Sequence, residues 1–133
     1  MFRHLYVLDD KKVKDILKNG RLSCAYYVSM VLKMFDLISQ PHATVKGALR
    51  DMQKNGWRTT RQFKPGNVLV WEEKKFSDGE THQHLGFYLG KDKAISNSDQ
   101  KSVPLVHHLT YGQTKDGQPK RKIIQMLTHR LIK

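Results

Sequence analysis

The spacing of the apolar residues changes near Gly56, and this change limits the folds that the chain can adopt. Before Gly56, apolar residues recur at intervals of three and four over 24–38 and again over 45–52, which is the spacing of one helix face. After it, short runs rich in β-formers alternate with turns that contain glycine or proline. Helices followed by antiparallel strands predict an α+β domain.

A length of 133 residues fits one domain with a single core, which we divide into three parts. These parts are a leader over 1–20, a helical half over 21–56 and an antiparallel sheet over 65–133. The leader is expected to contain a short helix over 11–19 that stops at Gly20.

Two further helices are expected in the helical half. Ser23 is a favourable N-cap residue for the long helix over 24–38, and Thr44 for the helix that ends at Asn55 and Gly56. The sheet is expected to contain the following strands: 67–71, 84–89, 93–97, 103–108 and 121–132. The polar segment 72–81 is expected to be a loop.

The chain is strongly basic, with 24 Lys and Arg against 12 Asp and Glu and a formal net charge of +12. Such a surface attracts polyanions, including nucleic acid, anionic lipid headgroups and the acidic polymers of a bacterial wall. A basic surface that only keeps the protein in solution explains the charge equally well.

The single cysteine excludes an internal disulfide and a four-cysteine zinc site. Cys24 stands at the expected first turn of the long helix, where unpaired N–H groups and the helix dipole favour a thiolate and lower the thiol pKa. Its spacing to Val28 and Val31 also fits a small core residue. A second catalytic group is therefore needed to choose between the two interpretations.

His84 is the expected partner of Cys24 because it begins a strand that would hold its ring rigidly. Gly86 lies two residues on and leaves that face open to another element or to a substrate. If the long helix crosses this face, the thiol and the imidazole can form the ion pair that activates a cysteine. Trp57, Trp71 and His82 are expected near the substrate groove, although both tryptophans also suit a core.

A third polar group is needed to orient the imidazole. With a two-residue turn at 91–92, Gly86 is expected to pair with Asn97, which would place Asn97 beside His84. A three-residue turn would place Ser96 there instead, and Asp99 also remains a candidate. We choose Asn97 because its carboxamide oxygen accepts a hydrogen bond well.

Three segments together resemble motifs of the NlpC-type and CHAP-type cell-wall cysteine hydrolases, in the same order. They are SCAYYVS at 23–29, KPGNVLVW at 64–71 and HLGFYLG at 84–90. The families have a nucleophilic cysteine at a helix start, a KPGD turn before a strand, and an HVGIYLG strand with the base. The resemblance covers roughly 22–98 and is more specific than any one segment.

This resemblance implies a papain-like fold and a peptidase or amidase that cleaves amide bonds of peptidoglycan without a metal or other cofactor. Cys24 would be the nucleophile and His84 the base, while the families' third catalytic position, commonly histidine, aligns near Ser96 and Asn97. The cysteine N–H would hold the oxyanion, with Tyr6 and Gln40 as candidate side-chain donors.

Other functions are compatible with parts of the sequence. His82 and His84 have the spacing of a zinc-binding pair, with His107 and His108 as further ligands, but no acidic cluster accompanies them. A basic nucleic-acid-binding module could use its aromatic residues for stacking, although no RNA-binding or zinc-finger motif is present. A catalytically inactive homologue that binds wall peptides is the third alternative.

The sequence lacks an apolar run of about 20 residues and an amino-terminal signal segment. We expect a monomer without a membrane span that binds peptidoglycan or its peptides and, through its charge, anionic wall polymers. Action at the wall would then require a larger exported protein, another export route or release by lysis.

Overall fold

The computed structural model describes residues 4–18, 22–76 and 79–133. These residues form two helices and eight strands. In chain order they are β1 Tyr6–Asp9, β2 Lys12–Asp15, α1 Cys24–Met34, α2 Val45–Lys54, β3 Arg58–Thr59, β4 Val68–Lys75, β5 Thr81–Gly90, β6 Lys93–Asn97, β7 Pro104–His108 and β8 Ile123–Thr128.

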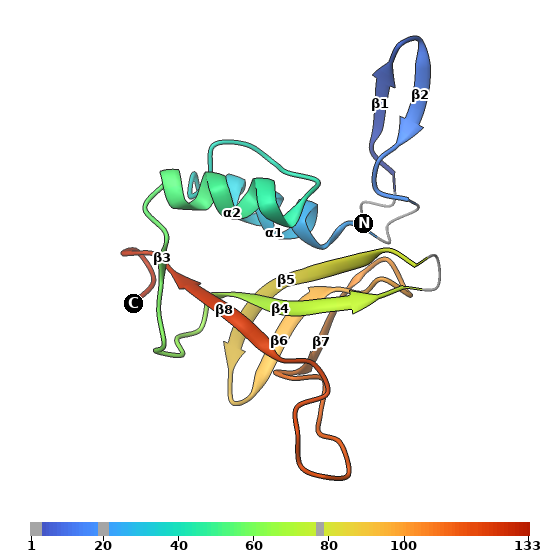
Figure 1. Ribbon diagram of the computed structural model, residues 1–133. Coiled ribbons are helices and arrows are strands. Elements are labelled where there is room, and N and C mark those ends of the chain that lie inside the picture. The colour runs from blue at the N-terminus through green and yellow to red at the C-terminus, as the bar shows by residue number, and fades with distance from the viewer. Residues whose placement is uncertain (1–3, 19–21, 77–78) are drawn as a thin grey trace.

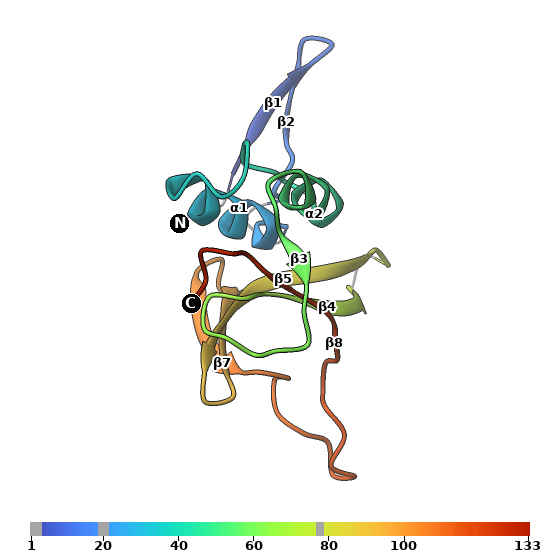
Figure 2. The same ribbon diagram turned by 90° about the vertical axis from the view of Figure 1, so that its left-hand side faces the viewer.

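Strands β3 to β8 form one antiparallel sheet in the order β3-β8-β4-β5-β6-β7. Both helices lie on the same side of this sheet, and the hairpin β1–β2 projects away from the body (Figure 1). The view turned by 90° shows the same two layers (Figure 2). The described part of the chain is thus a mixed α+β protein, as the change in apolar spacing predicts.

The helical layer and the sheet share the larger hydrophobic core. Alternate residues of β4 and β5 point toward the helices because successive side chains of a strand face opposite sides. Val68, Val70 and Leu85 are fully buried there against the apolar stripes of α1 and α2. Removing such a side chain from water contributes roughly 1.5–3 kcal/mol, which fixes the helices on this face.

The other face of the sheet has its own smaller core. Leu69, Trp71, Tyr88, Ala94 and Met126 are buried on it. Trp71 is at its centre, and its indole nitrogen donates a hydrogen bond to the carbonyl of Leu109 (2.8 Å). This bond attaches the segment after β7 to the sheet.

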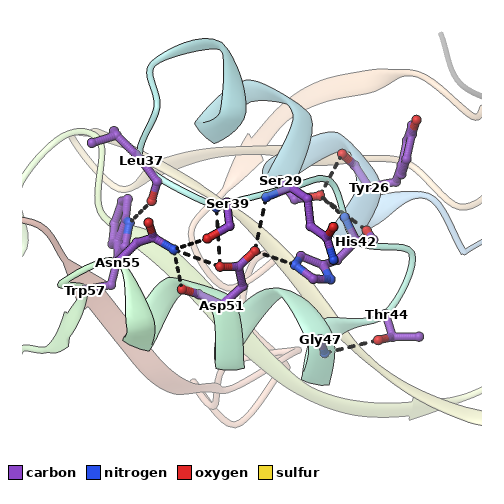
Figure 3. Close-up of polar contacts among 11 residues, drawn as sticks. Tyr26, Ser29, Leu37, Ser39, His42, Thr44, Gly47, Asp51, Asn55 and Trp57 are labelled. Carbon is purple, nitrogen blue, oxygen red and sulfur yellow. Dashed lines mark hydrogen bonds and ion pairs between the residues drawn. The ribbon is translucent and has the colours of Figure 1, made fainter.

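A buried carboxylate fastens the segment between the helices, as Figure 3 shows. Asp51 of α2 accepts hydrogen bonds from the backbone of Ser39 and Gln40, from the His42 ring (2.7 Å) and from the Asn55 amide (2.7 Å). Burial raises the pKa of this carboxyl, but these hydrogen bonds outweigh it and lower the pKa to about 2. Asp51 is therefore ionised at neutral pH and holds 39–42 against α2.

The leader helix expected over 11–19 is wrong for the described residues of that segment. Val7, Leu8 and Val13 instead belong to a two-stranded hairpin, in which Asp9 pairs with Lys12. The turn residues Asp10 and Lys11 both have positive φ angles, of 43° and 64°. This geometry suits the tight turn of a hairpin. The predicted stop at Gly20 lies outside the described residues.

The expected helix over 24–38 ends early, at Met34, although its start at Cys24 is confirmed. Asp36 has a positive φ of 52°, and Leu37 donates its N–H back to the carbonyl of Leu32, as at a helix end. Helix α2 begins after Thr44, as predicted. The Thr44 side chain accepts a hydrogen bond from the N–H of Gly47 and so caps the helix.

The loop expected over 72–81 is wrong at both of its ends, where the described residues belong to strands. β4 continues to Lys75, and β5 begins at Thr81, three residues before His84. Glu73, Lys74 and Lys75 are exposed to water in this part of β4, which explains their polar character. The closing strand is shorter than 121–132 and spans Ile123–Thr128. Within the part of the chain that the structure describes, neither helix has the length and apolar run needed to cross a membrane.

Candidate functional site

Cys24 is the first residue of α1, and its thiol is free and buried, with 9% of the residue exposed. The first helical hydrogen bond runs from the N–H of Tyr27 to the carbonyl of Ser23. The preceding N–H groups, including that of Cys24, have no acceptor within the helix. They are therefore available to stabilise negative charge at this end of α1.

Burial raises the pKa of the Cys24 thiol, and this effect exceeds the lowering by hydrogen bonds from the backbone of Leu85 and Ala25 and by the charge of Arg121. The expected lowering of this pKa is therefore wrong. The helix start does favour the thiolate, but desolvation by the surrounding core favours the neutral thiol more strongly.

His84 lies on β5 directly opposite Trp71 of β4, and the two ring centres are 5.6 Å apart. The residue is 9% exposed. Burial, helped by the charges of Arg121, His107 and Lys74, lowers its pKa to about 3. At neutral pH the imidazole is uncharged, so the resting site contains a neutral thiol and a neutral imidazole and not the expected ion pair.

Cys24 and His84 line the same cavity, which has a volume of about 390 Å³. The start of α1 and the start of β5 meet at one end of the molecule (Figure 1). The thiol accepts its backbone hydrogen bond from Leu85, the residue that follows His84. The structure thus brings the two candidate catalytic residues to one cavity. It does so differently from the expected way, because α1 packs against the face of β5 that carries Leu85, and His84 lies on the opposite face beside Trp71.

The expected pairing of Gly86 with Asn97 is wrong. The turn has two residues and Gly90 pairs with Lys93, as predicted, but a bulge between Tyr88 and Gly90 shifts the pairing by one residue. Gly86 therefore pairs with Ser96. A bulge inserts one extra residue in one strand. Beyond the bulge, each residue therefore pairs with a partner one position away from the expected one, and that partner points to the other face of the sheet.

Ser96 occupies the position beside His84 that the sequence assigned to Asn97. Its hydroxyl is 2.9 Å from His84 Nε2. Asn97 faces the helical layer instead and donates a hydrogen bond to the hydroxyl of Ser23, the residue before the candidate nucleophile. Asn97 thus joins the start of α1 to β6, while Asp99 lines a second cavity that also contains His84.

Gly86 allows the close approach of neighbouring strands, which is one of the two roles expected for it. A Cβ atom at this position would lie 2.5 Å from the Ile95 carbonyl, 2.8 Å from the Ser96 Cβ and 2.9 Å from the Trp71 ring. Real Cβ atoms do not approach other atoms so closely. The missing side chain lets Ser96 and Trp71 come together under His84.

Two residues that the sequence did not include in the catalytic group complete the hydrogen-bond cluster. His107 Nε2 is 2.8 Å from the Ser96 hydroxyl, and the Tyr111 hydroxyl is 3.1 Å from it. The His107 and Tyr111 rings are stacked with centres 4.0 Å apart, and both contact Trp71. His107 is two residues from Leu105, the strand partner of Ser96, so correct register would have predicted its side of the sheet.

The second cavity has a volume of about 520 Å³ and adjoins the first at His84. Arg121 lines it and donates hydrogen bonds to the carbonyls of Glu72 and His82. Its charge lowers the pKa of His84 and of Cys24. Arg121 thus gives the site a positive potential that the sequence analysis did not anticipate.

The three expected groove residues have different positions. His82 lines the cavity that contains Cys24, and its ring is 3.1 Å from the Glu80 carboxylate. Trp71 is fully buried and packs against the His84 ring. Trp57 does not join the site, since it is 3% exposed under the helical layer and donates to the carbonyl of Leu37.

The two side chains suggested as oxyanion donors belong to other regions. Tyr6 is 61% exposed on the projecting hairpin. Gln40 is exposed in the segment that Asp51 holds through its backbone. Among residues 4–18, 22–76 and 79–133, no group of three or more His, Cys, Asp or Glu side chains is arranged to hold a metal ion.

No protein-family model matches this chain, and a search of curated proteins finds no match to its sequence. The chain is therefore characterised by its own fold and site and not by a known relative. They define a mixed α+β protein in which a helix-start cysteine and a strand histidine share one cavity.

Proposed function

We propose that this chain is a papain-like cysteine hydrolase that cleaves amide bonds of bacterial peptidoglycan. Cys24 is the nucleophile, His84 the general base and acid, and Ser96 the residue that orients the imidazole. The observation that carries the proposal is the shared cavity of Cys24 and His84, together with the hydrogen bond between the His84 ring and the Ser96 hydroxyl.

The first half of the reaction forms a thioester. The thiol proton moves to His84 while the sulfur attacks the amide carbonyl, since neither group is charged in the resting site. The resulting oxyanion is stabilised by the N–H of Cys24 at the start of α1. The imidazolium then gives its proton to the leaving amine as the C–N bond breaks.

The second half releases the acyl group. A water molecule loses a proton to His84 and attacks the thioester carbonyl, and the C–S bond breaks. The proton returns to the sulfur, which regenerates the neutral thiol and imidazole. No metal or other cofactor takes part in these steps.

The substrate class is suggested by the resemblance of the three motifs and is compatible with the charge of the chain. Stem peptides of peptidoglycan carry carboxylates, and the walls contain acidic polymers. The formal charge of +12 and the position of Arg121 beside the site favour such anionic substrates.

Digestion of purified peptidoglycan, with mass spectrometry of the released fragments, tests the proposal. We expect new amino or carboxyl termini with the wild-type protein and none with Cys24→Ala, which removes only the sulfur. Ser102→Ala, in the turn before β7, is a matched control that should retain activity.

Three outcomes would contradict the proposal in different ways. Turnover by Cys24→Ala would exclude the nucleophile. Tight binding of wall fragments without turnover by either protein would indicate an inactive wall-binding homologue. Salt-sensitive binding to DNA or RNA, with no effect on peptidoglycan, would favour the nucleic-acid-binding alternative.

A further inference from the structure

The hydrogen bonds around Ser96 determine where the protons of the cluster lie. His107 Nδ1 is 2.8 Å from the carbonyl oxygen of His108. A carbonyl oxygen can only accept, so His107 Nδ1 must carry a proton. In a neutral ring the other nitrogen, Nε2, then carries none and can only accept.

His107 is neutral at physiological pH. Burial lowers its pKa, and this effect exceeds the raising by the hydrogen bond to the His108 carbonyl. Because His107 Nε2 is then an acceptor 2.8 Å from Ser96 Oγ, the hydroxyl must donate its only proton to it.

Ser96 Oγ consequently has two lone pairs left and no further proton. It lies 2.9 Å from His84 Nε2 and 3.1 Å from the Tyr111 hydroxyl. Both must act as donors toward it, because two facing acceptors at these distances would repel each other. His84 therefore carries its proton on Nε2, and Nδ1 is left with a free lone pair.

We infer that His107 is a positioning residue: through the Ser96 hydroxyl it holds His84 in the tautomer whose unprotonated Nδ1 can accept the thiol proton. The cluster needs no carboxylate for this purpose, because the carbonyl of His108 supplies the fixed acceptor at its far end. The inference about the tautomer stands on the hydrogen bonds together with the neutral state of His107, whereas its catalytic use rests on the proposed function.

Nitrogen-15 NMR of the substrate-free protein at neutral pH tests the tautomer directly, since a protonated and an unprotonated ring nitrogen have well-separated shifts. The His84 signals are assigned by their loss in His84→Gln. We expect His84 to carry its proton on Nε2 and His107 on Nδ1. A proton on His84 Nδ1 would overturn the inference.

Two substitutions of His107 test the cause. His107→Phe keeps a ring to stack on Tyr111 but removes the acceptor, so the Ser96 hydroxyl becomes free to donate to His84. We expect part or all of the His84 proton to move to Nδ1 and peptidoglycan cleavage to slow by at least about tenfold. His107→Gln places a carboxamide oxygen near the position of Nε2 and should restore the tautomer and most of the rate.

His4→Phe is the matched control, because His4 lies on the projecting hairpin and bonds to Asp15. It should leave the His84 shifts and the cleavage rate unchanged. An unchanged His84 tautomer in a folded His107→Phe protein would refute the role of His107. The expected shifts in a protein that cleaves no peptidoglycan would refute the proposed function while leaving the tautomer inference intact.

Discussion

Two histidine hydrogen-bond networks lie on opposite sides of the sheet, and they differ in the charge of the group that accepts hydrogen bonds in each. In the helical layer, the His42 ring bonds to the Asp51 carboxylate (Figure 3). On the other face, the His84 ring bonds to the Ser96 hydroxyl, and the chain of bonds continues to the neutral His107. The acceptor in the first network is a negatively charged carboxylate, whereas the acceptors in the second are neutral groups.

The difference separates a network that fixes a loop from one that, under the proposed function, would serve catalysis. Asp51 accepts hydrogen bonds from backbone and side-chain donors, so its network is saturated and fixes a loop. The Ser96 network leaves one nitrogen of His84 without a proton. Only that arrangement provides a base beside the Cys24 cavity.

The largest effect is expected from His84→Gln, which keeps an N–H donor for Ser96 but removes the base. Peptidoglycan cleavage should fall by roughly 1000-fold or more, while the protein remains folded. His42→Gln in the other network should retain activity in its folded fraction. Rates from released fragments, normalised to folded protein, measure both, and equal losses would contradict the distinction between the networks.

Acid is expected to destabilise the protein through His84 first. Its folded pKa of about 3 lies below the ordinary value of 6.5, so between these values the unfolded chain binds the proton and the folded chain does not. Stability is therefore full above about pH 6.5 and falls as pH drops toward 3, by roughly 1.4 kcal/mol per pH unit from this group.

Urea unfolding at a series of pH values measures this dependence. His84→Gln should show a slope smaller by that amount between pH 6.5 and 3. An identical slope in the two proteins would mean that His84 is not held in its neutral form.

A smaller loss of stability is expected from Asp51→Asn, on the order of 2–3 kcal/mol, because the buried network loses its charged acceptor. The folded pKa of about 2 lies below the ordinary 3.8, so the contribution of Asp51 is present above about pH 4 and is lost as pH falls toward 2. The variant should lack this acid-dependent part. Asp116→Asn in the exposed loop before β8 is the control, and equal stabilities would contradict the role of Asp51.

The smallest effect is expected from Ser29→Ala. Ser29, His42 and Asp51 have the residue types of a catalytic triad, but Ser29 accepts a hydrogen bond from the backbone of His42 and not from its ring (Figure 3). The variant should lose about 1 kcal/mol of stability and no activity. Loss of cleavage in a folded Ser29→Ala protein would mean that the catalytic network has been assigned to the wrong side of the sheet.

The candidate site could be predicted from the sequence only in part. The helix start at Cys24 follows from local spacing and is confirmed, and His84 lies on a strand as predicted, although β5 begins three residues before it, at Thr81. The orienting residue was misassigned because a single bulge before Gly90 exchanges Ser96 for Asn97. His107 lies a strand further away, so its place depends on that same register.

Two further predictions were wrong because they, too, depended on contacts between segments distant in the sequence. The apolar residues at 13, 16 and 17 fit one helical turn, but pairing with 6–9 made the described part of this segment a hairpin. The pKa of Cys24 is another example, since its position at a helix start is visible in the sequence and its burial is not.

From Cys24 onward, the sequence by itself determined that helices precede strands. It also determined the helix that begins at Cys24 and the strand that carries His84, because these features depend on neighbouring residues and their spacing. The tertiary structure decided the strand register, the partner of the imidazole and the protonation of both reactive groups. These depend on contacts between distant segments and on exclusion of water, which become defined only when the layers pack together.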